Sequence, residues 1–396
     1  MRRILLSSLV LLAACATPPP PQPPRVELPV AWKETAPRFA DEGRWWRIYQ
    51  DAELDGLINE AIARNTDLVI AVARVDEARA LVADARGAQM PTVDARAGAQ
   101  RQQNSKSTAT FFPGIPTQYS DYRATLNVSW ELDLFGRLRS TAAAASADLQ
   151  ASEAARDAVR LALTAQVVKS YFALRAFDEQ LAMTNRNVNL REDALGLQRR
   201  RFQAGVISEF ELRQLEAEAA AVRAQLPPLE RAREQEEAAL AVLLGRSPKQ
   251  IIEAEVKRTS IYDQSLEPAV VPAGLPSELL LRRPDLVEAE RRLAAANARI
   301  DAARADMFPS IVLTGVAGRE SSALSNLFSG PAGLYLLAAS ITQPIFAGGR
   351  LEARTDAARA RERAALAQFQ KSIQNAFSEV RSAIAGQARS RESFEA

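Results

Sequence analysis

The chain has 396 residues, of which 47% are hydrophobic and 25% are charged, a composition typical of folded proteins of one or two domains. Its 50 lysines and arginines nearly balance 48 acidic residues, and a net charge of +2 gives no footprint for a nucleic-acid partner. Histidine is absent and there is one cysteine, so the commonest general base, disulfides and thiolate metal clusters are excluded, and we expect neither an enzyme nor a metal site.

The N-terminus has the pattern of a secretory signal that ends at a lipid-attachment cysteine. Arg2 and Arg3 precede an apolar run of 11 residues, 4–14, which is too short to span a bilayer. The Leu-Ala-Ala before Cys15 resembles the bacterial lipobox, where the chain is cut before an acylated cysteine. We expect S-diacylglycerol and N-acyl groups on Cys15 and no other cofactor; an ordinary signal peptide is the alternative. Ala16 favours the outer membrane, by analogy with bacterial lipoproteins.

A proline-rich tether follows the predicted signal, which occupies residues 1–14. Six of the eight residues in 17–24 are proline, which fixes φ and removes hydrogen-bond donors. We therefore interpret 15–30 as the lipidated cysteine and an extended spacer between lipid and folded body. The remainder divides into a first structural repeat, 31–273, and a second, incomplete repeat, 274–396.

An internal duplication is the strongest structural signal. Residues 67–91 and 285–309 both begin Asp-Leu-Val, both have a helical pattern and both end in proline, at a constant separation of 218 residues. Proline cannot continue a helix interior. Beyond each proline lie a strand-like stretch, a loop, a second strand-like stretch and a glycine turn. The duplication is as large as a domain, so it predicts two structural repeats.

The clearest strand signal lies between Arg123 and Leu134, where polarity alternates with period two. Even-numbered residues from Ala124 to Leu134 are apolar. Odd-numbered residues are polar: Thr125, Asn127, Ser129, Glu131 and Asp133. The length suits a tilted transmembrane strand of roughly 9–11 residues, apolar toward lipid and polar toward a lumen. Tyr335, Leu337, Ala339 and Ile341 continue the apolar face in the second repeat, but the residues between them are less polar than in the first: Leu336, Ala338, Ser340 and Thr342. A half-buried strand of a soluble sandwich is the alternative.

A long helix is predicted after Gly136. Residues 137–201 contain no proline and one glycine, and ten of the 21 residues in 142–162 are alanine, a strong helix former. A helix of about 65 residues would be about 100 Å long at 1.5 Å per residue. Such a helix needs long neighbouring helices, and alanine permits their close approach.

The chain is then predicted to reverse near Gly205. Glycine supplies the turn and Ser208 can cap the returning helix. The return should run to Leu226, where two prolines interrupt it, and then resume until Leu244. Residues 137–244 are thus expected to form one antiparallel helical hairpin.

Several motifs resemble those of one family. The most specific is Gly-Leu-Pro-Ser-Glu-Leu-Leu-Leu-Arg-Arg-Pro-Asp at 274–285, which is similar to the opening of the second repeat in TolC-like outer-membrane factors of the OprM/NodT type. Residues 343–350 resemble that family's strand-to-helix exit, Trp45-Trp46 resembles the start of its first repeat, and 201–208 resembles its hairpin tip. The resemblance covers residues 12–396.

The resemblance implies a mainly α fold with a transmembrane β part. Long helical hairpins would form a periplasmic tunnel, and four strands per chain would contribute to the twelve-stranded barrel of a homotrimer. The residues agree, because four strands are too few to close a membrane barrel and open edges are not tolerated in lipid. The implied function is passive conduction of small molecules, such as drugs and toxic compounds, to the exterior.

The implied partners are an inner-membrane resistance-nodulation-division pump, a periplasmic membrane-fusion adaptor and outer-membrane lipid. Arg201, Gly205, Val206 and Ser208 would dock the adaptor, although simple hairpin closure also explains this turn. The second repeat departs from the family, since it ends at the equivalent of Met183. The second tip, whose acidic residues constrict the entrance in the family, is then absent and no gate residue is assigned.

Other functions fit parts of the sequence. A type I protein-secretion channel has the same architecture, but the lipobox and the 274–285 motif favour efflux. A structural or adhesive lipoprotein with a coiled-coil stalk, or a remnant without transport, is left open by the short second repeat. Glu131 and Asp133 would suit paired catalytic carboxylates, but a polar lumen explains them equally, and no nucleophile–base pair or phosphate loop accompanies them.

Overall fold

The structure, a computed structural model, consists of two compact units. It describes residues 43–107, 114, 116–253, 255–259 and 282–395. The predicted signal, Cys15, the tether and most of the 274–285 motif lie outside the described residues. One unit comprises 76–152 and 286–373, and we call it the sheet unit; the other comprises the described parts of 28–75, 153–285 and 374–396, and we call it the helical unit. Within the described residues, no helix combines the length and apolarity needed to cross a membrane.

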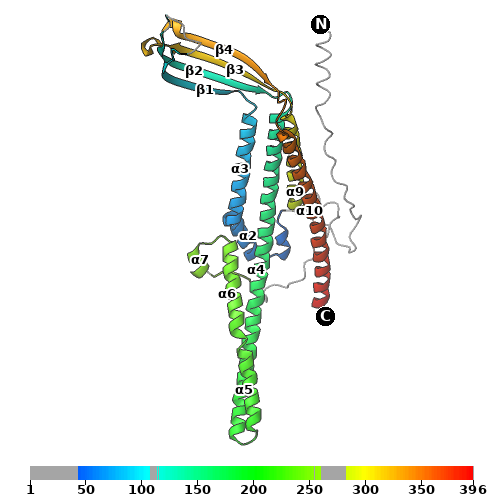
Figure 1. The fold of residues 1–396 in the computed structure, drawn as a ribbon. Helices are drawn as coiled ribbons and strands as arrows, with labels where there is room; N and C mark the ends of the chain where they lie inside the picture. Colours follow the sequence, from blue (N-terminus) through cyan, green and yellow to red (C-terminus); the bar gives the residue numbers. More distant parts are fainter. Residues whose placement is uncertain (1–42, 108–113, 115, 254, 260–281, 396) are drawn as a thin grey trace. The chain divides into compact units, whose positions relative to one another are not determined.

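The sheet unit contains one four-stranded antiparallel sheet (Figure 1). Its strands lie side by side in chain order: β1 (Thr92–Gln103), β2 (Gln118–Leu132), β3 (Ser310–Ser321) and β4 (Gly333–Thr342). The strand predicted from Arg123 to Leu134 exists, but its bounds were wrong, because the ladder extends back to Gln118 and ends at Leu132. Beyond Leu132 the chain turns toward a helix, with Gly136 at a φ of 80°.

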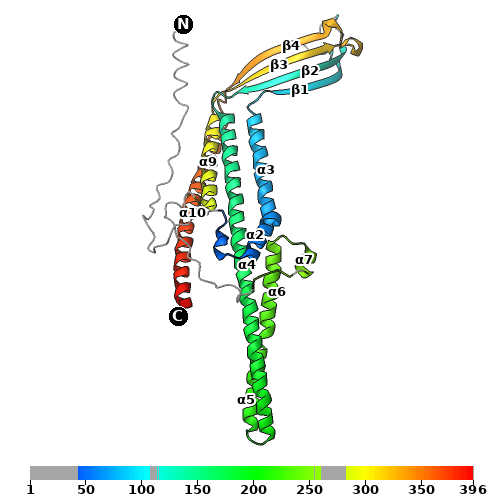
Figure 2. The same ribbon diagram turned by 180° about the vertical axis from the view of Figure 1, so that it is seen from behind.

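The order helix, strand, strand, helix occurs twice, as the duplication predicts (Figure 2). The first set is α3 (Thr66–Gly87), β1, β2 and α4 (Arg137–Gln203), and the second is α9 (Pro284–Ala305), β3, β4 and α10 (Arg350–Glu395). Pro91 and Pro309 each stand between the first helix of a set and its first strand. Both prolines therefore mark the change from helix to strand.

The predicted long helix is confirmed, because α4 is continuous over 67 residues. The chain returns as α5 (Glu209–Arg223) and α6 (Leu226–Leu243), followed by the short α7 (Pro248–Glu253). The position of the interruption was wrong: α5 ends at Arg223, and the two prolines stand inside the first turn of α6. Proline is tolerated there because its missing N–H would have no helical partner.

The core of the helical unit joins η1 (Trp45–Tyr49) and α2 (Ala52–Arg64) to α4 and α6. Its fully buried members recur at intervals of three or four residues, the spacing of one helix face: Leu54, Ile58 and Ala61 on α2, Val167, Tyr171 and Leu174 on α4, and Leu240 and Leu244 at the end of α6. Burial of each large apolar side chain contributes about 1.5–3 kcal/mol. This core fixes the base from which the α4–α5 hairpin extends.

Candidate functional site

The first candidate surface is the sheet, whose two faces differ in polarity. On one face the register places apolar residues opposite one another, for example Val93 opposite Val128 and Ala95 opposite Leu126. The large side chains exposed on this face are Val93, Leu126, Val128, Trp130, Tyr335, Leu337 and Ile341. An exposed apolar surface of this kind marks contact with another apolar phase or partner. The apolar residues predicted in both repeats thus lie on one continuous face of the sheet.

The opposite face carries polar and charged side chains on β1 and β2, together with the apolar Val316 on β3 and the exposed Leu336 on β4. Arg123 lies opposite Glu320 and donates to its carboxylate at 2.8 Å. Thr125 lies opposite Arg96, whose guanidinium donates to Asp94 at 2.7 Å. A hollow of about 530 Å³ opens on this face. The face therefore presents fixed charges of both signs to whatever fills the hollow.

Three of the five predicted lumen residues lie on this polar face of β2. Thr125 is buried against Gly318 of β3, and Asn127 donates to the Thr125 hydroxyl at 3.5 Å. Ser129 is exposed and lies opposite Thr92. The alternation of the sequence thus placed these three side chains correctly on the sheet.

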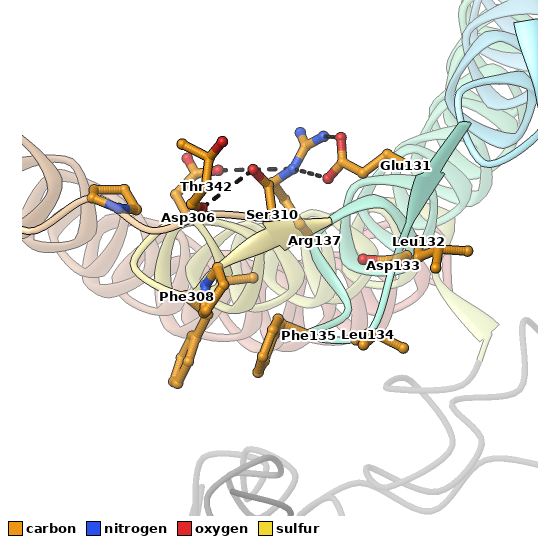
Figure 3. Close-up of a pocket in the computed structure, with 13 residues that line it drawn as sticks. Glu131, Leu132, Asp133, Leu134, Phe135, Arg137, Asp306, Phe308, Ser310 and Thr342 are labelled. Carbon is orange, nitrogen blue, oxygen red and sulfur yellow. Dashed lines mark hydrogen bonds and ion pairs between the residues drawn. The ribbon is translucent and has the colours of Figure 1, made fainter. Parts of the chain in front are cut away.

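Glu131, the fourth predicted residue, lies at the end of β2 and is held by an arginine (Figure 3). Arg137, the first residue of α4, donates to both carboxylate oxygens of Glu131 at 2.6 and 3.1 Å. The carboxylate of Asp306 lies 4.0 Å from the same guanidinium. Hydrogen bonding to Glu131 raises the pKa of Arg137 above its ordinary value. Glu131 is therefore a structural partner of α4 as well as a residue of the polar face.

Asp133, the fifth predicted residue, was wrongly assigned to the strand. It lies beyond Leu132 and accepts hydrogen bonds from the backbone N–H groups of Leu138 and Arg139, at 3.2 and 2.8 Å. A carboxylate in this position satisfies donors that the first turn of α4 leaves free, and it complements the helix dipole. Asp133 is therefore a cap of α4.

The base of the sheet also has an aromatic side. Phe135 and Phe308 stack with ring centroids 5.0 Å apart and an interplanar angle of 12°. Figure 3 shows the two rings projecting from the opposite side of the chain to Arg137 and Glu131. A cavity of about 300 Å³ is lined by residues of both groups, among them Arg137 and Phe308. Both repeats contribute to this junction, because Phe135 precedes α4 and Phe308 precedes β3.

The second candidate surface is the hairpin tip, where the predicted turn is confirmed. Gly205 has a φ of 74°, which favours glycine, and Val206 N–H donates to the Arg201 carbonyl at 2.9 Å. Ser208 and Glu211 form a reciprocal capping box at the start of α5. The Ser208 hydroxyl is thus already engaged in closing the hairpin.

Apolar side chains project from this tip. Val206 is 60% exposed and Phe210 is 77% exposed, and Phe202 lies partly exposed at the end of α4. Phe210 was missed in the sequence, although a large aromatic residue in the first turn after a capping serine is an unusual choice for a solvated helix start. The tip therefore exposes an apolar surface beside Arg201, whose guanidinium donates to Gln198.

A buried ion pair, also missed in the sequence, supports the hairpin at its base. Asp51 caps α2 and lies 3.3 Å from Arg175 of α4, and both side chains are only 1% exposed. The Tyr171 hydroxyl donates to Asp51 at 2.6 Å. Burial, together with this hydrogen bond, raises the pKa of Tyr171. The cluster ties the start of the helical unit to the long helix.

The described residues thus provide surfaces for contact. Among them, no group of three or more Cys, Asp or Glu side chains is arranged to hold a metal ion. These surfaces are the polar face of the sheet, its apolar face and the exposed tip of the helical hairpin.

Solved structures with the same fold are outer-membrane channels. The structure is similar to the Campylobacter jejuni CmeC outer membrane channel, with a TM-score of 0.87 and 24% identity over 93% of this chain and 78% of that one. It is also similar to the open state of the Neisseria gonorrhoeae MtrE outer membrane channel, with a TM-score of 0.83 and 33% identity over 96% of this chain and 84% of that one. The predicted TolC-like fold is confirmed.

The family model described as "Outer membrane efflux protein" matches residues 57–246 and 275–396, and the chain belongs to this family. It is 37% identical over 354 residues to the probable efflux pump outer membrane protein TtgC of Pseudomonas putida, covering 89% of this chain and 72% of the relative. It is 33% identical to the cation efflux system protein CusC of Escherichia coli, covering 86% and 72%. The family is one of outer-membrane channels and not of enzymes.

Proposed function

We propose that the chain is the outer-membrane channel of a tripartite efflux system. It would conduct small molecules passively from an inner-membrane pump and a periplasmic adaptor to the exterior, with no catalytic step of its own. The observation that carries this proposal is a two-faced sheet joined directly to a 67-residue helix in a chain of this family. The names of TtgC and CusC, an efflux pump protein and a cation efflux protein, support it.

In this proposal the apolar face of the sheet contacts outer-membrane lipid and the polar face lines the lumen. Thr125, Asn127, Ser129 and Glu131 would then meet the exported molecules. A single chain leaves the edges of β1 and β4 unpaired within the sheet. Unpaired backbone groups are costly in lipid, and three copies would close a twelve-stranded barrel that has no edges.

The tip of the hairpin would dock the periplasmic adaptor. Arg201, Gly205, Val206 and Ser208 shape it, and the exposed rings of Phe202 and Phe210 add apolar surface. We predict that Val206→Asp abolishes crosslinking to the adaptor and restores dye accumulation in a strain that depends on this chain for efflux. A buried charge at an apolar interface is disfavoured unless it is paired.

Val242→Asp is the matched control, because Val242 lies on α6 and is 58% exposed, close to the 60% of Val206. It should leave crosslinking and efflux at the wild-type level. Unchanged crosslinking in Val206→Asp would remove the docking role from this tip. The channel proposal itself would be overturned if the wild-type chain were recovered as a monomer that is not attached to the membrane and did not lower dye accumulation.

A lipid on Cys15 would anchor the N-terminus. The support is the sequence Leu-Ala-Ala-Cys after a short apolar run. Each buried CH₂ of the acyl chains would contribute about 0.8 kcal/mol. Labelled palmitate should be incorporated into the wild-type chain and not into Cys15→Ser. Equal labelling of the two chains would exclude this anchor.

A further inference from the structure

The loop between β4 and α10 exposes two large apolar side chains, Ile345 and Phe346, at the base of the sheet. They are 90% and 91% exposed, more than any other large apolar side chain in the part of the chain that the structure describes. The loop itself is held in place, because the side-chain amide of Gln343 donates to the Met307 carbonyl at 3.0 Å. Two such side chains on a fixed loop indicate contact with a partner.

The duplication gives Phe346 an equivalent in the first repeat, which is Phe135. Phe135 leads through a glycine and Arg137 from β2 into α4, and Phe346 leads through two glycines and Arg350 from β4 into α10. Phe135 is only half-exposed, and its ring stacks on Phe308 with centroids 5.0 Å apart (Figure 3). The residue that leaves the sheet in the first repeat thus packs on the residue that enters it in the second.

The same duplication gives Phe308 an equivalent, which is Met90. Each stands directly before the proline that precedes the first strand of its repeat, 218 residues apart. Met90 is 65% exposed. Its position is fixed, since its backbone N–H donates to the Gly87 carbonyl and the Trp130 indole donates to the carbonyl of the preceding residue, both at 2.9 Å. Met90 and Phe346 are therefore the exposed counterparts of the stacked pair.

Strand pairing explains why Phe135 and Phe308 meet. β2 and β3 are antiparallel with Leu132 opposite Ile311, so the end of β2 lies beside the start of β3. The end of β4 and the start of β1 lie at the two outer edges of the sheet. When β4 of one copy pairs with β1 of another in the antiparallel sense, the end of β4 comes beside the start of β1. Phe346 then reaches Met90 of the neighbouring copy.

We propose that Phe346 packs on Met90 of the neighbouring copy and that this contact stabilises the trimer at the base of the sheet. It repeats between copies the contact that Phe135 and Phe308 make within one chain. The thioether of methionine adapts to an aromatic ring and contacts it favourably. This inference rests on the proposed trimeric channel.

Lipid is the competing occupant of this surface, since aromatic girdles flank the apolar band of membrane barrels. Phenylalanine and isoleucine lack the polar group that tyrosine and tryptophan place at the wet side of such an interface. The equivalent ring, that of Phe135, is covered by protein. Both observations favour a second copy of the chain.

The main test is the rate at which the purified trimer of the full chain dissociates in detergent. Phe346→Ala should dissociate about tenfold faster than the wild type, and Met90→Phe should dissociate more slowly, because it supplies the second ring of the equivalent pair. Phe328→Ala is the matched control, since Phe328 is 76% exposed and lies between β3 and β4, away from the base of the sheet. It should dissociate at the wild-type rate.

A double variant distinguishes the neighbouring copy from lipid. If the two side chains touch each other, Met90→Ala combined with Phe346→Ala should dissociate about as fast as the faster single variant, because the second change removes a contact that is already lost. Rate increases that multiply would indicate two separate contacts, as with lipid, and would overturn the proposal.

Crosslinking in membranes gives an independent measurement. With a short bifunctional thiol reagent, Met90→Cys combined with Phe346→Cys should give linked dimers and trimers, and neither single variant should exceed the wild type. The proposal is overturned if the double variant gives no linked species, if Phe346→Ala leaves dissociation unchanged, or if Phe328→Ala accelerates it equally. A wild type that forms no trimer would remove the channel proposal too, whereas a trimer that is indifferent to Phe346 would remove this contact alone.

Discussion

Among the glycines of the sheet, Gly318 leaves the least space for a side chain. A Cβ there would lie 2.2 Å from the carbonyl oxygen of Ala124 and 2.7 Å from the Cα of Thr125. These are backbone atoms of β2, and they cannot move without disturbing the β2–β3 ladder. We predict that Gly318→Ala lowers the free energy of unfolding by about 1–3 kcal/mol, the usual cost of overpacking. Thermal unfolding of the purified chain in detergent measures this.

Gly98→Ala provides the comparison for that measurement. Gly98 lies in the neighbouring strand β1, where a Cβ meets nothing within 4 Å. The melting temperature of the Gly98→Ala variant should equal or exceed that of the wild type, because alanine reduces the conformational freedom of the unfolded chain. Equal loss of stability in both variants would show that the close approach at Gly318 has no special cost.

The sequence predicts single residues only where a local pattern places them. Alternation with period two identified Thr125 and Ser129, since neighbouring positions on a strand point to opposite faces. The same alternation misplaced Asp133. The apolar/polar pattern of the sequence continues to Leu134, whereas the strand ends at Leu132, so Asp133 caps α4 instead of lying on the sheet. Local patterns missed the Asp51–Arg175 pair, whose members are 124 residues apart in sequence and meet only through packing of α2 on α4.

Among the elements, the α4–α5 turn depends on one ionised carboxylate. Hydrogen bonding to Ser208 lowers the pKa of Glu211 below its ordinary value of 4.5. Because the folded pKa is the lower one, the stabilisation is fully present above the ordinary value and is lost as the pH falls through the folded pKa. We predict that amide hydrogen exchange at the start of α5, corrected for intrinsic rates, accelerates as the pH falls from above 4.5 through the lower pKa that Glu211 has in the folded state.

Glu211→Gln tests the cause of this acceleration. Glutamine can still accept from the backbone at this position, but it does not titrate. The variant should therefore keep partial protection and lose the pH dependence. Glu218→Gln, an exposed change on the same helix, should keep the wild-type profile. A profile for Glu211→Gln that matches the wild type would assign the pH dependence to another group.

Elements with strong local signals were predicted well. An alanine-rich run without proline fixes the type of α4, and the tip follows from Gly205 and Ser208, where conformation and capping are both local. The break between α5 and α6 was displaced, because a proline is compatible with the first turn of a helix and does not itself mark the end of the preceding one.

For the whole molecule, the direction of the strands determines how copies can join. Each neighbouring pair in the sheet is antiparallel, so β4 runs opposite to β1. A second copy can therefore place its β1 beside β4 and continue the antiparallel pattern, and a third can close the ring. Within one chain, β2 and β3 separate β1 from β4, at roughly 4.8 Å per strand, so a direct β1–β4 contact can form only between chains.

We predict that Ala339→Cys in β4, combined with one of Val93→Cys, Ala95→Cys or Ala97→Cys in β1, gives disulfide-linked dimers and trimers in membranes. These positions share the apolar face, and a disulfide needs Cβ atoms about 3.5–4.5 Å apart, so only the residue directly opposite Ala339 should react efficiently. Asp94→Cys and Arg96→Cys, on the other face, should not react, and neither should the wild-type chain, whose one cysteine is Cys15. If no β1 position on the apolar face gives a linked trimer, β1 and β4 do not meet between copies, and the barrel must close by another edge or not at all.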